Sequence, residues 1–527
     1  MKLEITKPIT AREVITYRKT RSINIDSFRE DVSQCGVVQS ASEDLCQLVK
    51  DFDSDLRCIL DQHAPLKQNM VTIRPNTGWY NDDIRREKHV KRQLERHWRQ
   101  SGLSHDRLLY VDQCRKVDSM CDDAYVKHIQ THISDNSKNT KELFNITKKL
   151  TMRNATQKLP AHDTLEELTE TFADYFHDKV QRIRSNLEEL RGQSTILPDT
   201  ECPNTFLEFS ETTEEEVKKI ITESASKSCE LDPIPTWLLK QCLDHLLPVI
   251  TKIVNLSLSS GHLPDDLKNA ILRPLIKKAL LDSNVLKNFR PVSNLTFISK
   301  VIEKVVAVQL KQHFHTNCLN DILQSAYKEM HSTETALLKV QNDILCALDD
   351  GCCVLLIMLD LSAAFDTVDH TVLLSRLSTR FGVKGVALSW IESYLTDRSQ
   401  CVSINGVTSA KRKLTCGVPQ GSVLGPLLFS AYTSPLGDIV RKYGLSYHIY
   451  ADDKQLYIAF KPLKEIMAKS VEVSENCVSE VRAWFSHNFL QLNDDKTIIM
   501  LFGSQYRKLP ALPSVQGQCS SSFIKDC

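Results

Sequence analysis

The sequence predicts an α+β protein in which a mainly helical N-terminal region precedes a compact unit of alternating helices and strands. Three observations predict this class. Apolar residues recur at helical spacing through the first part of the chain, for example from Leu45 to Leu60. The continuous apolar run Cys353–Leu359 is typical of a buried central strand. Short alternating runs on both sides of Asp452 and Asp453 predict a β-hairpin.

Size and composition indicate a folded protein of a reducing compartment. The 527 residues include 66 basic and 66 acidic side chains, so any basic surface is local. The 17 cysteines show no Cys-x-x-Cys spacing, which argues against a disulfide framework and against a zinc site. The longest apolar run, Cys352–Leu359, is too short to span a membrane, and the N-terminus has no apolar signal core. We expect a protein of the nucleus or cytoplasm that is neither secreted nor inserted in a membrane.

A basic helix is expected between Ile84 and Arg99. A solvated helix face and a surface for the phosphates of a nucleic acid explain this pattern equally well. The pattern favours nucleic-acid binding only if the rest of the chain carries nucleic-acid chemistry. The candidate nucleic-acid-binding residues are Arg85, Arg86, Lys91 and Arg92.

Two acidic sites are the first candidates for such chemistry. Asp360 follows the predicted central strand, where a single aspartate is more often a helix cap or turn residue. Asp452 and Asp453 lie at the tip of the predicted hairpin, where aspartate also serves turns, but the aromatic and β-branched flanks indicate burial. Buried carboxylates are costly unless a cation neutralises them. Phosphoryl transfer by two divalent ions about 3.5–4 Å apart requires such acids, and hard oxygen ligands favour Mg²⁺.

A segment rich in glycine and proline, residues 416–429, lies between the two acidic sites. Ser422 is the expected N-cap of a helix that has Pro426 in its first turn. Glycines such as Gly421 let the backbone approach a ligand closely, and the Gln420 amide offers a donor and an acceptor. A Gly/Pro loop alone is common in proteins. Its position between the two acidic sites makes this one a candidate part of the functional site.

In this order the motifs resemble those of the reverse transcriptases of non-LTR retrotransposons, nearest to the chicken-repeat, L2 and jockey-like elements. The resemblance covers most of residues 10–503, and Ile498 departs from it at a position that is commonly acidic. The matching segments are Asn288–Ser293, Gln324–Tyr327, His331–Leu337, Leu359–His370, Gly417–Pro426, Tyr450–Asp453, Leu490–Asn493, Lys496–Thr497 and Leu501–Gly503, with His63–Lys67 and Glu230–Lys240 upstream.

The resemblance implies the fingers and palm of a right-hand polymerase, with an antiparallel palm sheet backed by helices. It implies that Asp360, Asp452 and Asp453 bind two Mg²⁺ ions. It also implies that Lys496 protonates the departing pyrophosphate, the alternative being an exposed lysine after a turn.

The same resemblance assigns the nucleotide-binding residues. Arg290 is expected to clamp the triphosphate, and Arg273, Lys277 and Lys278 are expected to add positive potential nearby. Lys277 is counted with Arg290 among the nucleotide-binding residues. Phe365 matches the aromatic gate that crowds a ribose 2′-hydroxyl, although a core aromatic is the alternative. Gln420 and Gly421 are expected to line the incoming nucleotide and the template.

The implied activity is RNA-directed DNA synthesis, in which deoxynucleoside triphosphates extend a DNA primer on an RNA template. A non-catalytic nucleic-acid-binding remnant of a decayed element and a structural helical scaffold are the alternatives. No segment resembles the endonuclease or the thumb of this family. We therefore expect a truncated polymerase of weak or absent activity, with an endonuclease supplied by another protein. The expected domains are a helical connecting region (1–195), a helical segment (205–257), fingers and palm (258–506) and an unmatched tail (507–527).

Overall fold

The computed structural model describes residues 12–72, 78–137, 139–140, 143, 146, 159–189, 201–227, 229–278 and 281–503, so the tail predicted at 507–527 lies outside it. Contacts divide the chain into a smaller unit, Met1–Arg18 with Leu66–Leu159, and a larger unit, Lys19–Pro65 with Pro160–Cys527. Within the described ranges, no helix combines the length and the hydrophobicity that a membrane span requires.

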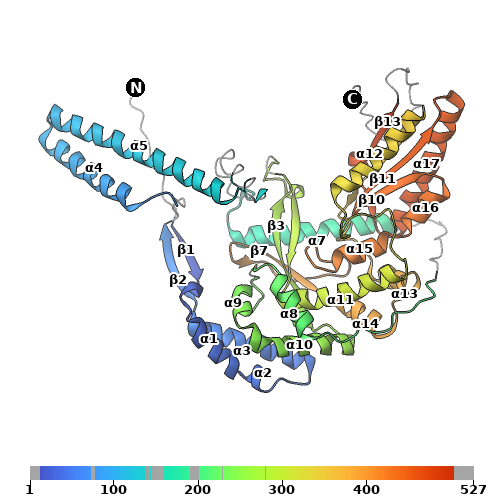
Figure 1. The fold of residues 1–527 in the computed structure, drawn as a ribbon, viewed down its shortest axis with the longest axis horizontal. Helices are drawn as coiled ribbons and strands as arrows, with labels where there is room; N and C mark the ends of the chain where they lie inside the picture. Colours follow the sequence, from blue (N-terminus) through green and yellow to red (C-terminus); the bar gives the residue numbers. More distant parts are fainter. Residues whose placement is uncertain are drawn as a thin grey trace. The chain divides into compact units, whose positions relative to one another are not determined.

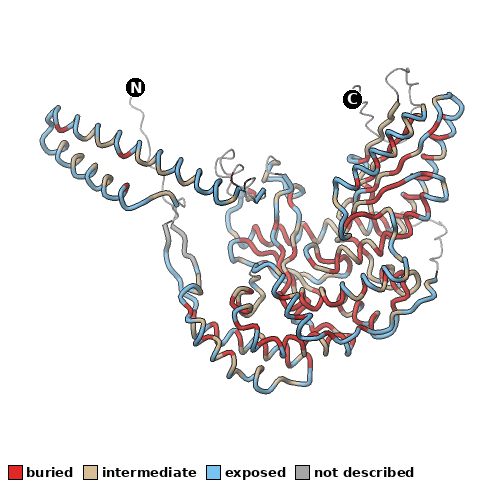
Figure 2. The backbone as a smooth tube through the Cα atoms, viewed as in Figure 1, coloured by how far each residue is buried: buried red, intermediate tan, exposed pale blue. Residues whose placement is uncertain are grey.

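The smaller unit contains a two-stranded antiparallel sheet and a helical hairpin whose surface is largely exposed (Figures 1 and 2). The predicted basic helix is the first helix of this hairpin. It begins after Asn81, whose side chain accepts the N–H of Ile84 at 2.9 Å, and it ends at Gly102 with φ of 67°. The elements are β1 (Arg12–Tyr17), β2 (Lys67–Thr72), α4 (Asp82–Ser101) and α5 (Ser104–Asp135).

The larger unit contains a four-stranded antiparallel sheet, here called the palm sheet, with strand order β10-β11-β5-β13 (Figure 1). The predicted central strand is its β5, and the predicted hairpin is β10 with β11, so both predictions are confirmed. The strands are β5 (Cys353–Leu359), β10 (Ser446–Tyr450), β11 (Asp453–Phe460) and β13 (Ile498–Phe502).

Both faces of β5 are covered, which explains why its apolar run is continuous. Leu355 and Ile357 belong to the main hydrophobic core. Val354 and Leu356 point to the other face, where they join a cluster with Val340 of helix α12 (Thr333–Asp349). Successive side chains of a strand point to opposite faces, so a strand buried on both sides has no polar positions.

A second sheet of the larger unit has strand order β4-β3-β7-β8, with β9 also paired to β7. The β3–β4 pair is antiparallel, and β3 pairs with β7 in parallel. A further small pair, β6 with β12, connects two of the predicted motifs. These strands are β3 (Asn269–Ile276), β4 (Phe289–Asn294), β6 (Leu361–Ser362), β7 (Ser399–Ile404), β8 (Val407–Thr408), β9 (Arg412–Lys413) and β12 (Gln491–Leu492).

Helices make up most of the rest of the larger unit. Helix α8 begins where the sequence predicts a capped start, because Thr213 and Glu216 form a capping box. The remaining helices of the described part are α1 (Ile25–Gln34), α2 (Gly36–Gln39), α3 (Leu45–His63), α7 (Leu165–Glu189), α8 (Glu214–Glu223), α9 (Thr236–Gln241), α10 (Leu243–Ser260), α11 (Phe297–Thr316), α13 (His370–Thr379), α14 (Gly385–Leu395), α15 (Gly425–Thr433), α16 (Leu436–Lys442) and α17 (Lys464–His487), with short 3₁₀ turns at Thr20–Ser22, Asp265–Leu267, Leu286–Asn288 and Asp494–Lys496.

The predicted connecting region, residues 1–195, is divided between the two units. Helix α3 buries Leu48 and Phe52 in the main core, which it shares with α10. Helix α7 buries Phe172 completely, and this ring packs edge-on against Phe289 of β4. Apolar burial therefore attaches α3 and α7 to the larger unit, whereas their spacing in the sequence placed them with the basic helix.

Candidate active site

The three predicted metal ligands lie at one end of the palm sheet. Lys454 of β11 pairs with Leu359 of β5, so the adjoining residues, Asp453 and Asp360, occupy neighbouring positions at the same edge. Asp452 precedes Asp453 in the turn that joins β10 to β11. The strand register therefore brings together three acids that the sequence separates widely.

The charges of these acids act on one another. Loss of hydration, together with the negative charges of Asp452 and Asp360, raises the pKa of Asp453. Carboxylate oxygens are the donors that a hard divalent cation prefers, and such a cation would relieve this repulsion. Among the described residues, however, no three His, Cys, Asp or Glu side chains are arranged so that they could hold a metal ion. The donor set thus fits a divalent cation in chemistry and charge, while the side chains are not drawn together around one point.

A tight turn presents Asp452 and Asp453. Ala451 has φ of 58°, in the left-handed region, and its N–H donates to the buried Gln324 side chain at 3.2 Å. The same Gln324 oxygen accepts the N–H of Ala326 at 2.9 Å, so the predicted Gln324–Tyr327 motif supports the turn. The hydrogen bond to Ala451 helps to hold this left-handed residue in place, and the bond to Ala326 orients the Gln324 side chain that makes it.

A buried lysine that the sequence analysis did not single out lies beside the acids. The Lys454 ammonium donates to the backbone carbonyl of Asp452 at 3.0 Å. It also lies over the rings of Phe429 and Phe485, at 5.4 and 5.5 Å from their centroids. Burial lowers the pKa of Lys454 to about 8, although the nearby aspartates act in the opposite direction. In the sequence, the one feature that could have drawn attention to Lys454 is its position directly after the two aspartates, at the start of the predicted strand.

A second lysine, Lys496, contacts Asp360 directly. Its Nζ lies 2.9 Å from Asp360 Oδ2, and the Asn493 amide donates to the same oxygen at 3.0 Å. The backbone N–H of Asn493 donates to the Asp360 carbonyl at 2.9 Å, so the two motifs are joined through main chain and side chains. Lys496 is 65% exposed, which agrees with the alternative of an exposed lysine, but its ammonium faces the predicted metal ligand.

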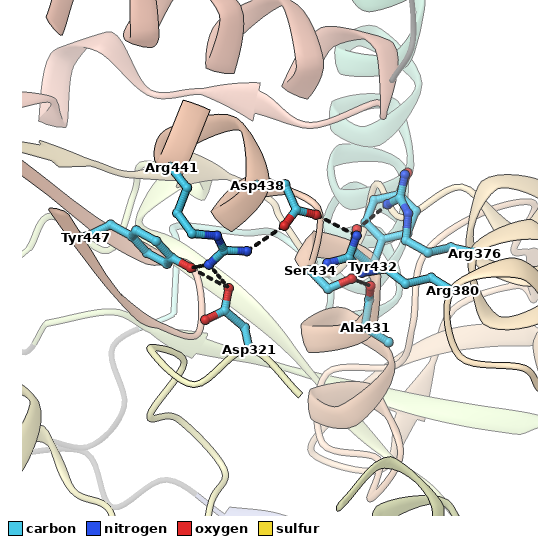
Figure 3. A network of polar contacts seen from close by, with 9 residues as sticks. All are labelled: Asp321, Arg376, Arg380, Ala431, Tyr432, Ser434, Asp438, Arg441 and Tyr447. Atoms are coloured by element: carbon cyan, nitrogen blue, oxygen red, sulfur yellow. Dashed lines mark hydrogen bonds and ion pairs between the residues drawn. The ribbon is translucent and has the colours of Figure 1, made fainter. Parts of the chain in front are cut away.

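A polar network anchors the hairpin that carries the aspartates (Figure 3). Tyr447 of β10 donates its hydroxyl to Asp321 at 2.9 Å and contacts Arg441 of α16. Asp438 accepts from Arg441 and also from Arg380 at 2.7 Å, which connects α16 to α13. Burial and the Asp321 carboxylate raise the pKa of Tyr447, so the phenol stays protonated and continues to donate.

Phe365 and Gln420 each make a specific contact near the acids: Phe365 with Phe429 and Gln420 with Asp366. The Phe365 ring stacks on Phe429 with centroids 4.6 Å apart, a contact that the core alternative also explains, so the gate remains a prediction. The Gln420 amide lies 3.0 Å from each carboxylate oxygen of Asp366. Burial raises the pKa of Asp366 to about 6, although the charge of Lys179 and the Gln420 hydrogen bond lower it.

The loop that carries Gln420 is held by a buried carboxylate. Glu303 of α11 accepts the N–H groups of Val423 and Leu424 at 2.7 and 3.0 Å. The prediction that Ser422 is the N-cap is wrong, because α15 begins at Gly425 and Leu424 occupies the cap position. The Glu303 carboxylate satisfies the backbone there, and the Ser422 hydroxyl instead accepts the N–H of Gly425 at 3.0 Å. Glu303 is detectable in the sequence as a single acid within an apolar helix.

The predicted first-turn proline of α15 is confirmed at Pro426. Gly421 has φ of 115°, and a Cβ there would lie 2.7 Å from the carbonyl oxygen of Ser293 on β4. The Gly421 position therefore joins the Gly/Pro loop tightly to the second sheet.

The predicted phosphate-binding cations lie on the second sheet. Arg290 is exposed on β4, opposite Leu275 of β3, and Lys277 directly follows β3. Burial lowers the pKa of Lys277, and the positive charges of Lys179, Lys496 and Arg290 lower it further. The structure therefore brings these cations close to one another and to Asp360.

Arg273 does not contribute a free charge as expected. Its guanidinium pairs with Glu230, a residue of the upstream motif, which offsets the positive potential at this position. Glu230 also accepts from Ser403 of β7 at 3.1 Å, so the pair connects the upstream segment to the second sheet.

The four nucleic-acid-binding candidates lie on α4, in the smaller unit. Arg85 pairs with Asp82 at 3.0 Å, and Arg86 pairs with Asp83. Lys91 and Arg92 have no ion pair within the described part of the chain. Surface ion pairs of this kind are weak, so they leave the helix available to phosphates.

Comparison with known proteins agrees with this arrangement of residues. The family described as "Reverse transcriptase (RNA-dependent DNA polymerase)" matches residues 276–519. The chain therefore carries a reverse transcriptase domain. Its homologues are the RNA-directed DNA polymerases of non-LTR retrotransposons, which confirms the resemblance seen in the sequence.

Two of the matching relatives come from Drosophila melanogaster. The chain is 28% identical to the probable RNA-directed DNA polymerase from transposon BS of Drosophila melanogaster, over 54% of this chain and 31% of that protein. It is 25% identical to the RNA-directed DNA polymerase from mobile element jockey of the same species, over 64% of this chain and 38% of that protein. The chain thus spans about a third of the length of these two relatives.

Among solved structures, the chain overlaps apo telomerase from Candida tropicalis, truncated from its C-terminal domain. The TM-score is 0.34 at 13% identity, over 75% of this chain and 87% of the other. A TM-score of this size does not establish a shared fold. The assignment to the α+β class therefore comes from the palm sheet and the helices that cover it.

Proposed function

We propose that this chain is an RNA-directed DNA polymerase that extends a DNA primer with deoxynucleoside triphosphates on an RNA template. The observation that carries the proposal is the convergence of Asp360, Asp452 and Asp453 at one edge of the palm sheet, with Lys496 2.9 Å from Asp360. Three acids at one edge of the sheet, with a raised pKa at Asp453, provide the donor chemistry that catalysis by divalent metal ions needs. The match to the reverse transcriptase family, whose members depend on divalent metal ions, supports this assignment.

The residues of the site have distinct roles in this proposal. Asp360, Asp452 and Asp453 would hold two Mg²⁺ ions, which activate the primer 3′-hydroxyl and stabilise the leaving pyrophosphate when bound. Lys496 stays within reach of the departing phosphates and delivers the proton. The turn at Ala451 fixes the direction of the two adjacent carboxylates.

The second sheet supplies the binding groups. In this proposal Arg290 and Lys277 bind the triphosphate through charge-assisted hydrogen bonds. The charges of Arg290, Lys496 and Asp360 all act on Lys277, which supports a shared site for these groups. Gln420 presents its amide where the Gly/Pro loop meets Asp366, and Phe365, which stacks on Phe429, would crowd a ribose 2′-hydroxyl in this proposal. The loop stays in place through Glu303.

Primer extension tests the proposal directly. Purified wild-type chain should extend a DNA primer annealed to RNA in the presence of Mg²⁺, and Asp452→Ala should lower the rate by more than about 100-fold, as loss of a catalytic electrostatic group does. Asp349→Ala removes an exposed acid from α12 and should leave the rate unchanged. Equal extension by the wild type and Asp452→Ala would contradict the proposal.

A second candidate function is nucleic-acid binding without catalysis. The observation that favours it is the exposed row of cations on α4, which is distinct from the acid site. It predicts that wild type and Asp452→Ala bind RNA equally and that neither extends a primer. The extension assay and an RNA-binding assay on the same two proteins separate the two functions.

A further inference from the structure

Helix α7 lies outside the segment that matches the reverse transcriptase family, yet ion pairs fix it to the larger unit at two places. Near its N-terminal end, Glu170 and Asp174 pair with Arg412 of β9 at 2.8 and 2.7 Å. Near its C-terminal end, Arg184 pairs with Asp369 at 2.7 Å, and both side chains are 16% exposed. Figure 1 shows α7 as a long helix that runs across the larger unit.

The second attachment belongs to the motif that carries Asp360. Arg184 also lies over the ring of Phe489, 4.0 Å from its centroid, next to the motif that leads to Lys496. Asp369 caps α13, because its side chain accepts the N–H of Val372 at 3.1 Å. The Arg184–Asp369 pair contacts the motif that carries Asp360 and the residue that precedes the Leu490–Asn493 motif. It therefore fixes the position of α7 relative to the acid site.

The middle of α7 faces a cavity between these attachments. Lys179 lines it together with Asp366, Gln420, Pro291 and Gly417, which come from three of the predicted motifs. The Lys179 ammonium has no hydrogen bond or ion pair to any described residue, although the side chain is half-buried. An ammonium that makes no direct hydrogen bond or ion pair keeps its donors available to an anion.

Lys179 is electrostatically part of the predicted phosphate-binding cluster. Its charge acts on Lys277, which in turn is affected by Arg290, Lys496 and Asp360. It also acts on the buried carboxyl of Asp366, which Gln420 contacts. The positive charges of Lys179, Lys496 and Arg290 all oppose the charge of Lys277, so a polyanion that binds near these cations relieves their repulsion.

We infer that Lys179 is a further phosphate-binding residue of this active site, supplied by α7 and directed at the triphosphate of the incoming deoxynucleotide. The inference rests on the proposed polymerase function for its substrate. It extends the nucleotide site to a helix outside the matched segment. The phosphates of the template or primer share the same chemistry, and the measurements below distinguish the two sources.

Equilibrium binding tests the inference without requiring turnover. A deoxynucleoside triphosphate labelled with a fluorophore on its base is titrated, in Mg²⁺, into the full chain and three variants. Lys179→Ala should weaken binding roughly tenfold, the effect of losing one charge-assisted contact. Lys179→Arg should restore most of the affinity. Arg182→Ala removes an exposed charge from the same helix and should change affinity less than about twofold.

Each outcome decides between the alternatives. Unchanged triphosphate binding by Lys179→Ala, or equal losses for Lys179→Ala and Arg182→Ala, would overturn the inference. A loss of affinity only for a labelled primer–template duplex would also overturn it and would assign Lys179 to nucleic-acid phosphates. Normal triphosphate binding by a wild-type chain that does not extend primers would contradict the proposed activity alone. Thermal unfolding of each variant verifies that its fold is intact.

Discussion

Asp366 is a carboxyl that the fold buries beside the active site, and its ionisation is linked to stability. Its pKa is raised from 3.8 to about 6, mainly by burial. Between these values the folded protein retains a proton that the unfolded chain has lost, so the free energy of unfolding falls as pH rises from about 4 to about 6. Above that range the loss is complete, at about 3 kcal/mol.

Asp366→Asn should remove this dependence. The amide still accepts from Gln420 but does not ionise, so the variant should become more stable than the wild type by up to about 3 kcal/mol at pH 7. Urea unfolding at several pH values measures the difference, which should grow between pH 4 and 6 and then stay constant. The exposed substitution Asp349→Asn is the control. A stability difference that does not change with pH would refute the linkage.

Residue identity predicts the acids of the site but not the groups that support them. Asp360, Asp452 and Asp453 follow from motif order, because their chemistry requires those residue types at those positions. Lys454 and Glu303 act through buried contacts with partners distant in the chain. Such contacts depend on packing, which no local pattern in the sequence specifies.

At the scale of elements, the Gly/Pro loop and the loop after Phe365 pack so closely that a side chain does not fit at Gly417. Gly417 has φ of 86°, and a Cβ there would lie 2.6 Å from the carbonyl oxygen of Asp366. Gly406 also has φ of 86°, but no atom lies within 4 Å of the position of its Cβ. The two glycines share the same positive φ and differ in their surroundings.

Alanine substitutions at Gly406 and Gly417 separate the energetic cost of backbone strain from the cost of steric overlap. Gly406→Ala should destabilise the protein by about 1 kcal/mol, the cost of a left-handed alanine. Gly417→Ala should cost about 1–3 kcal/mol more, because the Asp366 backbone must move, and primer extension should fall with it. Chemical unfolding measures both substitutions. Equal destabilisation by the two would show that the close approach to Asp366 has no energetic consequence.

Helical periodicity predicts that α7 exists but not where it packs. Its apolar residues repeat as those of many helices do, and Phe172 and Phe176 are recognisable as a buried face. The pairing of Arg184 with Asp369 joins positions far apart in the sequence, as does the contact of Phe172 with Phe289. The sequence alone therefore leaves α7 in the connecting region.

At the scale of the whole molecule, patterns that repeat along the chain predicted the elements well. The alternation and continuous apolar runs identified β5, β10 and β11 because strands buried on known faces leave a simple signature. The division into two units was not predictable in the same way. The smaller unit is discontinuous in sequence, because Lys19–Pro65, which belongs to the larger unit, lies between its two segments. The burial of Leu48 and Phe52 in the core shared with α10, together with polar contacts such as Lys252 to Glu43, attaches this segment to the larger unit.

The smaller unit provides the last prediction, which concerns RNA affinity. If α4 binds phosphates, replacing Arg85, Arg86, Lys91 and Arg92 by glutamine should weaken binding of single-stranded RNA and flatten its salt dependence. Each phosphate contact on a single strand contributes about 0.7 to the slope of log affinity against log salt, so losing four contacts should reduce the slope by about 3. Glutamine has a helix propensity close to those of lysine and arginine, so the helix should persist.

A charge-preserving variant provides the matched control. Exchanging Arg85, Arg86 and Arg92 for lysine and Lys91 for arginine keeps every charge, so the slope should remain that of the wild type even if the affinity changes. Fluorescence anisotropy with a labelled RNA at four salt concentrations measures all three proteins. A glutamine variant with the wild-type slope would identify α4 as a solvated face, because counterion release reports only the phosphates that the protein neutralises. The pairs of Arg85 with Asp82 and of Arg86 with Asp83 would then account for the charge pattern of this helix.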